Sequence, residues 1–159
     1  MLTGNLGEVA LIAVTQGEKG LSGVKTELFV PLKPMLAETA DDAEETLREH
    51  GGRTVFEYKF DGARVQIHRL GDEVRVYSRR LTDVTESVPD IVNVVIRFLP
   101  RVGLIVEGEI TAVGPEGKPL PFQDLMRRFT RVNEVDEEAR RIPLRTTSST
   151  SSTSTAPYS

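Results

Sequence analysis

The sequence contains no cysteine and only two histidines, His50 and His68. The absence of cysteine excludes a disulfide framework, a thiolate nucleophile and a cysteine-based zinc site. Two histidines are too few for a histidine-rich metal centre. No apolar run approaches the roughly 18 to 20 residues that span a bilayer, and no secretory signal pattern follows Met1. We therefore expect a cytoplasmic protein that does not bind membranes.

The C-terminal segment, residues 146–159, lacks charge altogether. Eleven of its 14 residues are Ser or Thr, a composition that cannot form a hydrophobic core. As a whole, the chain has the composition of a globular protein: 38% of the 159 residues are hydrophobic, 28% are charged, and the net charge is −4. This length suits one domain or part of a larger protein.

Positive charge is concentrated in one part of the chain. Residues 53–80 contain seven basic and four acidic residues, whereas residues 1–52 contain four basic and nine acidic residues. Residues 81–123 are also acidic overall, with three basic and six acidic residues. A local positive excess in an otherwise acidic chain indicates an anionic ligand near residues 53–80 rather than a generally basic surface.

The spacing of apolar residues predicts a mixture of helices and strands. An apolar helical stretch covers residues 6–14, and residues 24–38 have the pattern of an extended linker. Asp41 and Glu44 predict a capping box at the start of a short helix. The further elements expected are strands at 54–70, 73–80 and 104–113, and helices at 88–99, 121–131 and 134–142. The sequence therefore predicts an α+β fold with antiparallel strands.

Residues 57–64, EYKFDGAR, carry the clearest chemical signal. Alternation puts Glu57 and Lys59 on one face of a strand, and Arg64 follows a turn. Nearby cations favour the neutral form of an amine, which covalent catalysis by lysine requires. Arginines in the same place bind phosphate through paired hydrogen bonds. The alternative interpretation is a solvated hairpin with alternating charges.

The segment EYKFDGAR resembles motif I, K-x-D-G-x-R, of the covalent nucleotidyltransferases, which include ATP-dependent DNA ligases, RNA ligases and mRNA capping enzymes. YSRRLTDVT, from Tyr77, resembles the segment that supplies a second arginine in DNA ligases. VEGEI, at residues 106–110, resembles motif III, and PFQDLMRRF resembles the stretch that follows it. GNLGEVA and VPLKPMLAE resemble the end of the DNA-binding domain, and its link to the adenylation domain, in archaeal-type replicative ligases.

The resemblance covers about residues 1–145 and implies a division into domains. Residues 1–30 are expected to be the C-terminal remnant of a helical DNA-binding domain with a linker. Residues 31–145 are expected to be the N-terminal part of an adenylation domain. This part would form the first half of a nucleotidyltransferase (ATP-grasp-like) fold with antiparallel sheets. Residues 146–159 are expected to be a disordered tail.

The resemblance also implies a role for each candidate site residue. Lys59 would attack the α-phosphate of ATP, forming an adenylyl-lysine and releasing pyrophosphate. Glu57 would lie by the adenine amino group, and Arg64 near the ribose and the nick end. Arg79 would contact the nucleotide or the nick phosphate, and Glu109 would bind the ribose. Magnesium would carry the phosphate charge in the first step.

The partners implied are ATP and nicked double-stranded DNA, in replication, repair and recombination. A full-length relative would bind a sliding clamp, and the protein would be a monomer. Because the later family motifs E-G-L-M-V-K and K-L-K and an OB-fold domain are absent, we expect this fragment to be incompetent for complete ligation and to adenylate Lys59 slowly or not at all. Two alternatives stay open: an RNA ligase or mRNA capping-type enzyme, and a non-catalytic nucleic-acid-binding module.

Four basic residues outside the motif have less specific interpretations. His68 lies on the strand after Arg64 and is interpreted as a plain polar strand residue. Arg127, Arg128 and Arg131 form a cluster that either contacts DNA phosphates or lies on a solvated helix face.

The tail also leads to a prediction about the gene. Read one base earlier, TCN serine codons become codons for Phe, Leu, Ile or Val, and ACN threonine codons become codons for Tyr, His, Asn or Asp. Residues 146–156 then fit the pattern Y-Y-F/L-F-D-L-L-Y-L-D-G, which is compatible with the Y-L-F-D-V-L-Y-V-D-G segment that follows motif III in the family. We predict that the tail is a frameshifted translation. Sequencing the DNA beyond the Arg145 codon should find E-G-L-M-V-K and K-L-K in the shifted frame; their absence there supports a genuine Ser/Thr linker.

Overall fold

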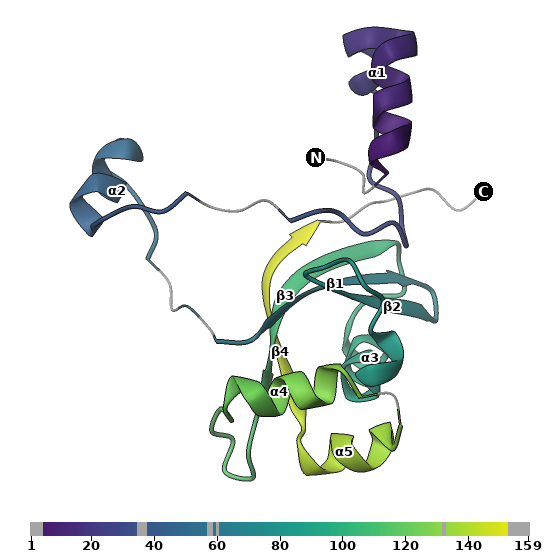
Figure 1. Ribbon diagram of the computed structural model, residues 1–159, viewed down its shortest axis with the longest axis vertical. Helices are drawn as coiled ribbons and strands as arrows, with labels where there is room; N and C mark the ends of the chain where they lie inside the picture. Colours follow the sequence, from purple (N-terminus) through teal and green to yellow (C-terminus); the bar gives the residue numbers. More distant parts are fainter. Residues whose placement is uncertain (1–4, 35–37, 57–58, 60, 132, 153–159) are drawn as a thin grey trace.

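The computed structural model describes residues 5–34, 38–56, 59, 61–131 and 133–152. The elements of this part are five α-helices, one short 3-10 helix and four β-strands (Figure 1). The helices are α1 Leu6–Leu21, α2 Ala43–Glu49, α3 Pro89–Phe98, α4 Phe122–Phe129 and α5 Val135–Arg141, with the 3-10 helix η1 at Thr85–Ser87. The strands are β1 Ala63–Leu70, β2 Glu73–Ser78, β3 Leu104–Ala112 and β4 Leu144–Ser152. The predicted α+β class with antiparallel strands is confirmed.

The four strands form one sheet in the order β2-β1-β3-β4, and each neighbouring pair is antiparallel. β1 and β2 are joined by the predicted two-residue turn at Gly71-Asp72, in which Gly71 has a φ of 61°. Such a left-handed conformation suits glycine because it has no Cβ. β1 lies in the interior of the sheet, paired with both β2 and β3, so its residues have neighbours on both sides.

The two faces of the sheet differ in chemistry because side chains alternate along each strand. One face is apolar and packs against α3 and α4, with α5 beside them (Figure 1). Its core comprises Val65, Ile67, Val74, Val76, Ile110, Ala112 and Leu144 from the strands, and Val88, Ile91, Val95, Leu125, Phe129 and Ile142 from the helical side. The other face carries polar side chains, and the candidate site lies there.

Two predictions about the N-terminal part need correction. The strand expected from residue 54 begins only at Ala63, and residues 53–56 and Lys59 are not in a strand. The capping box of α2 is shifted by one residue: Asp42, not Asp41, caps the helix by accepting a hydrogen bond from the Glu45 amide at 2.8 Å. The sequence DDAEE offers both registers equally, because Asp41 precedes Glu44 by the same spacing as Asp42 precedes Glu45.

Helix α1 begins where the sequence predicts but continues to Leu21, with a break at Gly17, whose φ is 60°. Asn5 caps it by accepting a hydrogen bond from the Glu8 amide at 3.2 Å. Neither α1 nor α2 buries a residue within the described chain, and both lie apart from the sheet in Figure 1. None of the helices in the described ranges is long and apolar enough to cross a lipid bilayer.

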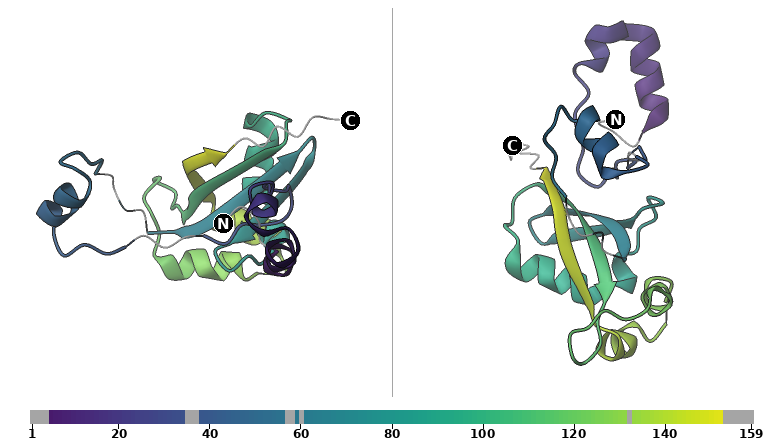
Figure 2. Two further views of the ribbon diagram at one scale, coloured as in Figure 1. Left: turned by 90° about the horizontal axis from the view of Figure 1, so that it is seen from above. Right: turned by 90° about the vertical axis from the view of Figure 1, so that its left-hand side faces the viewer.

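The Ser/Thr-rich tail is not disordered over its first part. Residues 144–152 form β4, which pairs with β3 from Ala112 opposite Leu144 to Ile105 opposite Ser152. The right-hand view of Figure 2 shows β4 running alongside β3. The prediction of disorder is therefore wrong for residues 146–152, because β3 offers backbone hydrogen-bonding groups and threonine suits a strand. The rest of the predicted tail, residues 153–159, lies outside the described residues.

Arg128 is fully buried and forms an ion pair across the apolar layer. Its Nη1 donates to the Ser87 carbonyl oxygen at 2.6 Å, and its Nη2 donates to Asp90 Oδ1 at 2.8 Å. The other oxygen of Asp90 accepts the Leu144 amide at 3.0 Å. Arg128 therefore links α4 to α3 and, through Asp90, to the start of β4. Because it is fully buried, both earlier interpretations of Arg128, as a contact to DNA phosphates and as part of a solvated helix face, are wrong. Arg127 and Arg131 are exposed.

The Arg128–Asp90 pair gives a test of this architecture. Asp90→Ala leaves a buried guanidinium without its carboxylate, so we expect a loss of about 3 to 5 kcal/mol in the free energy of unfolding. Glu116→Ala removes an exposed ion pair with Lys118 and should change it by less than about 1 kcal/mol. Urea unfolding followed by circular dichroism measures both. Equal effects of the two substitutions would contradict the structural role of Asp90.

Candidate functional site

The polar face of the sheet gathers the charged residues of β1 and β3. Arg64 lies directly opposite Glu109, and Gln66 lies directly opposite Glu107. The guanidinium of Arg64 forms an ion pair with Glu107, in which 41% of the Arg64 side chain and 24% of the Glu107 side chain are exposed. Residues two apart on a strand share a face, so one arginine stands between two carboxylates.

Gly62 brings the predicted motif against β3. A Cβ atom on Gly62 would lie 2.4 Å from the Ile110 carbonyl oxygen and 2.8 Å from Glu109 Cγ. No side chain fits in that space, so a glycine is needed for the chain to enter β1 beside Glu109. Lys59, three residues before Gly62, is exposed. The close approach therefore places Gly62 of the motif directly beside Glu109 of β3.

Arg79 is presented by the turn that follows β2. The Leu81 amide donates to the Ser78 carbonyl oxygen at 2.8 Å, and the Ser78 amide donates to the Thr82 carbonyl oxygen at 2.9 Å. Leu81 has a φ of 65°, a conformation that closes this turn. Arg79 is exposed and makes no ion pair with any residue in the described ranges.

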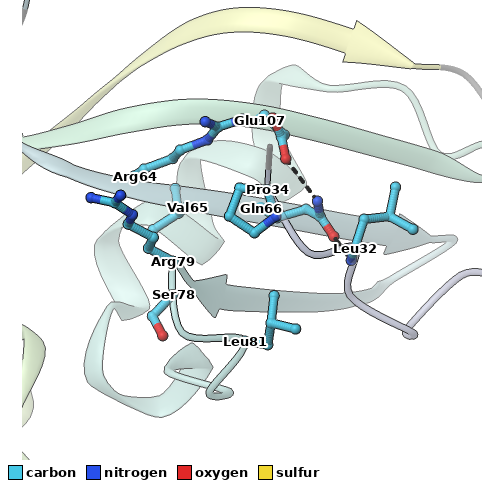
Figure 3. A pocket seen from close by; sticks show the side chains of 9 residues that line it. All are labelled: Leu32, Pro34, Arg64, Val65, Gln66, Ser78, Arg79, Leu81 and Glu107. Carbon is cyan, nitrogen blue, oxygen red and sulfur yellow. Dashed lines mark hydrogen bonds and ion pairs between the residues drawn. The ribbon is translucent and has the colours of Figure 1, made fainter. Parts of the chain in front are cut away.

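A shallow hollow on the polar face brings Arg64 and Arg79 together (Figure 3). Its lining residues come from the linker, β1, β2 with its turn, and β3: Leu32, Pro34, Arg64, Val65, Gln66, Ser78, Arg79, Leu81 and Glu107. Two guanidinium groups at one hollow suit an anionic ligand, since arginine binds phosphate oxygens through paired hydrogen bonds. The expected anion near residues 53–80 therefore has a candidate place.

The structure places four of the five predicted site residues. Arg64 and Glu109 are neighbours on paired strands, Arg79 shares the hollow with Arg64, and Lys59 lies just before Gly62. The fifth, Glu57, lies outside the described residues. Their catalytic and binding roles stay predictions.

Sequence reasoning missed Glu107, which takes the ion pair with Arg64. The signal was present in VEGEI, because alternation puts Glu107 and Glu109 on the same face of β3. The burial of His68 was not predicted either: the residue is fully buried, and burial lowers its pKa from 6.5 to about 4. Among the described residues, no group of three or more His, Asp or Glu side chains could hold a metal ion.

Comparison with known proteins relates the chain to one family. Residues 34–147 match the family model described as "ATP dependent DNA ligase domain". The chain is 49% identical over 144 residues to a DNA ligase of Thermococcus fumicolans and 47% identical over 145 residues to a DNA ligase of Methanopyrus kandleri. Each match covers 91% of this chain and 26% of the relative. The chain therefore spans about a quarter of the length of the curated relatives that it matches.

Among solved structures, a mycobacterial DNA ligase D complexed with ATP and MES matches with a TM-score of 0.43 and 21% identity. The match covers 58% of this chain and 27% of that chain.

The close approach at Gly62 is open to a direct test. Gly62→Ala should force β1 and β3 apart at the site, with a loss of about 1 to 3 kcal/mol in the free energy of unfolding. Gly7→Ala is the matched control, because the nearest heavy atom to a Cβ there is 3.6 Å away and alanine favours a helix. Thermal and urea unfolding compare the two variants. A Gly62→Ala protein as stable as Gly7→Ala would show that β1 and β3 do not approach so closely.

Proposed function

Because the chain belongs to the ATP-dependent DNA ligase domain family, we propose that it carries the adenylation chemistry of a DNA ligase, with Lys59 as the nucleophile. The observation that supports this most is the placement of the motif: Lys59 leads through Gly62 into β1, where Arg64 lies opposite Glu109. Arg79 lines the same hollow as Arg64. The proposed nucleophile, Lys59, therefore lies close in the sequence to residues that suit the phosphate and ribose of a nucleotide.

The proposed reaction transfers adenylate to the protein. The neutral Lys59 amine attacks the α-phosphorus of ATP, a nitrogen–phosphorus bond forms, and the bond to the bridging oxygen of pyrophosphate breaks. The amine loses a proton and pyrophosphate leaves. Arg64 and Arg79 bind phosphate oxygens or the nick end and balance their negative charge. Glu109 accepts hydrogen bonds from the ribose hydroxyls, and Glu57 takes the adenine amino group.

Magnesium fits this proposal as a partner of the nucleotide. The described residues offer no ready-made cluster of metal ligands, and Mg²⁺ commonly binds through phosphate oxygens and water with one or two carboxylates. When bound, it would neutralise phosphate charge. The chain's own contribution is the two arginines and the position of Lys59.

In the complete ligation reaction, adenylate passes to the 5′-phosphate of a nick in double-stranded DNA, and the 3′-hydroxyl then displaces AMP. We propose this reaction for the whole protein, in replication, repair and recombination, with a sliding clamp as a partner and a monomeric state. Residues 1–30 would belong to the DNA-binding domain and residues 31–145 to the adenylation domain. The family match favours a DNA ligase over an RNA ligase or a capping enzyme.

Covalent labelling of Lys59 tests the proposal. Prolonged incubation with α-labelled ATP and Mg²⁺ should give at most a weak label on the protein, because the hollow offers few contacts to a nucleotide. A nitrogen–phosphorus bond would make this label stable to alkali and labile to acid. Lys59→Ala should reduce the label to background, since it removes the attacking amine. Lys33→Ala is the matched control, because Lys33 is exposed between Leu32 and Pro34, which line the hollow. Label that survives in Lys59→Ala would contradict Lys59 as nucleophile, and unchanged DNA binding in that variant would then favour a non-catalytic module. No label on the unaltered chain would show that these residues do not adenylate on their own.

A further inference from the structure

Residues 29–32, here called the strap, lie across the polar face of the sheet and hydrogen-bond to it. The Phe29 amide donates to His68 Nδ1 at 2.8 Å, and the Leu32 amide donates to Gln66 Oε1 at 2.7 Å. The hydroxyl of Tyr77 donates to the Phe29 carbonyl oxygen at 2.9 Å. Phe29 has a φ of 65°, a strained conformation for a non-glycine residue. The strap is therefore held by specific contacts that offset this strain.

These contacts fix the proton positions on His68 and Gln66. Since Nδ1 of His68 accepts the Phe29 amide, the proton of the neutral ring is on Nε2, which lies 2.8 Å from Gln66 Oε1 and donates to it. His68 is fully buried, which favours this neutral form. Gln66 Oε1 thus faces two donors, and a flipped amide would face both with another donor. The orientation of Gln66 is set by the strap and His68.

The other end of Gln66 leads to the hollow. Its Nε2 donates to Glu107 Oε1 at 2.9 Å, and Glu107 Oε2 takes the ion pair with Arg64. Figure 3 shows Gln66 between Leu32 of the strap and Glu107. Hydrogen bonds therefore run without a break from the strap, through His68 and Gln66, to the carboxylate that holds Arg64. Gln66 is buried, so water does not easily replace its contacts.

We propose that Gln66 is a positioning residue for Arg64: the seated strap and His68 fix Gln66, Gln66 holds Glu107, and Glu107 aims Arg64 at the hollow. ATP as the anion in this hollow rests on the proposed function; the coupling of the strap to Arg64 does not. Loss of the link would leave Arg64 bound to a mobile carboxylate and weaken anion binding while the guanidinium groups of Arg64 and Arg79 are both still present.

Gln66→Glu separates the two halves of the link. A carboxylate at this position still accepts from the Leu32 amide and His68 Nε2, so the strap should stay seated. When ionised, it has no proton to donate to Glu107 and repels that carboxylate. Because two adjacent carboxylates favour sharing one proton, the variant is measured at alkaline pH, where both are ionised. We expect slow exchange of the Phe29 and Leu32 amides, as in the unaltered chain, but faster exchange and rotation of the Arg64 guanidinium by nuclear magnetic resonance. The affinity for Mg-ATP, measured by calorimetry, should fall about tenfold. Gln123→Glu, on the exposed surface of α4, makes the same change of charge and should alter neither measurement.

A second pair of variants tests the link from its other end without altering the sheet. Leu32→Pro removes the amide that donates to Gln66, and Leu32→Ala keeps this amide while removing the side chain. Arg64 should become more mobile in Leu32→Pro than in Leu32→Ala. An Arg64 signal that is unchanged in Leu32→Pro overturns the proposal; should Gln66→Glu fail to fold, this comparison alone decides it.

The results also separate this inference from the proposed function. If Arg64 responds as expected but no protein binds Mg-ATP, the coupling stands and ATP is the wrong ligand. If the unaltered chain binds Mg-ATP and Arg64 responds in none of the variants, the proposed function stands and the positioning role is overturned.

Discussion

The close contact between Gly62 and the backbone of β3 is the constraint on which the site depends. A Cβ at Gly62 would overlap the Ile110 carbonyl oxygen, so only a bare backbone lets the chain reach β3 at this point. The register that follows sets Arg64 opposite Glu109 and Gln66 opposite Glu107. The absence of a side chain at Gly62 is therefore compatible with the strand pairing in which Arg64 can meet Glu107 and Glu109.

The two faces of the sheet also differ in how their charged side chains are used. On the polar face, charged side chains remain partly exposed and converge on the hollow. On the apolar side, buried arginines satisfy backbone groups instead: Arg69 donates to the carbonyl oxygens of Val95 and Leu99 at the end of α3. The buried guanidinium of Arg128 similarly donates to the Ser87 carbonyl oxygen and pairs with Asp90, whose side chain is partly exposed. The excess of positive charge around the hollow is therefore smaller than the count of arginines suggests.

The local elements could be predicted from the sequence because each depends on near neighbours. The Gly71-Asp72 turn and the helices that became α3, α4 and α5 follow from short-range spacing. The partner of His68 could not be predicted, because it is a backbone amide 39 positions away and any residue supplies one. Arg128 was misjudged because it looks like Arg127, although the spacing of Leu125 and Phe129 indicates which arginine faces inward. The strap and the ion pair of Glu107 depend on register, which alternation alone does not supply.

The contact between Asp90 and the Leu144 amide spans 54 positions in the chain, whereas β1 and β2 are joined by a two-residue turn. Closing a long loop costs more chain entropy than closing a short one. We therefore expect β1 and β2 to pair first, because the pairings of β3 with β1 and of β4 with β3 both close much longer loops. During folding, the β1–β2 hairpin, which carries Arg64 and Gln66, would therefore become ordered before β4 and would serve as the template for the rest of the sheet.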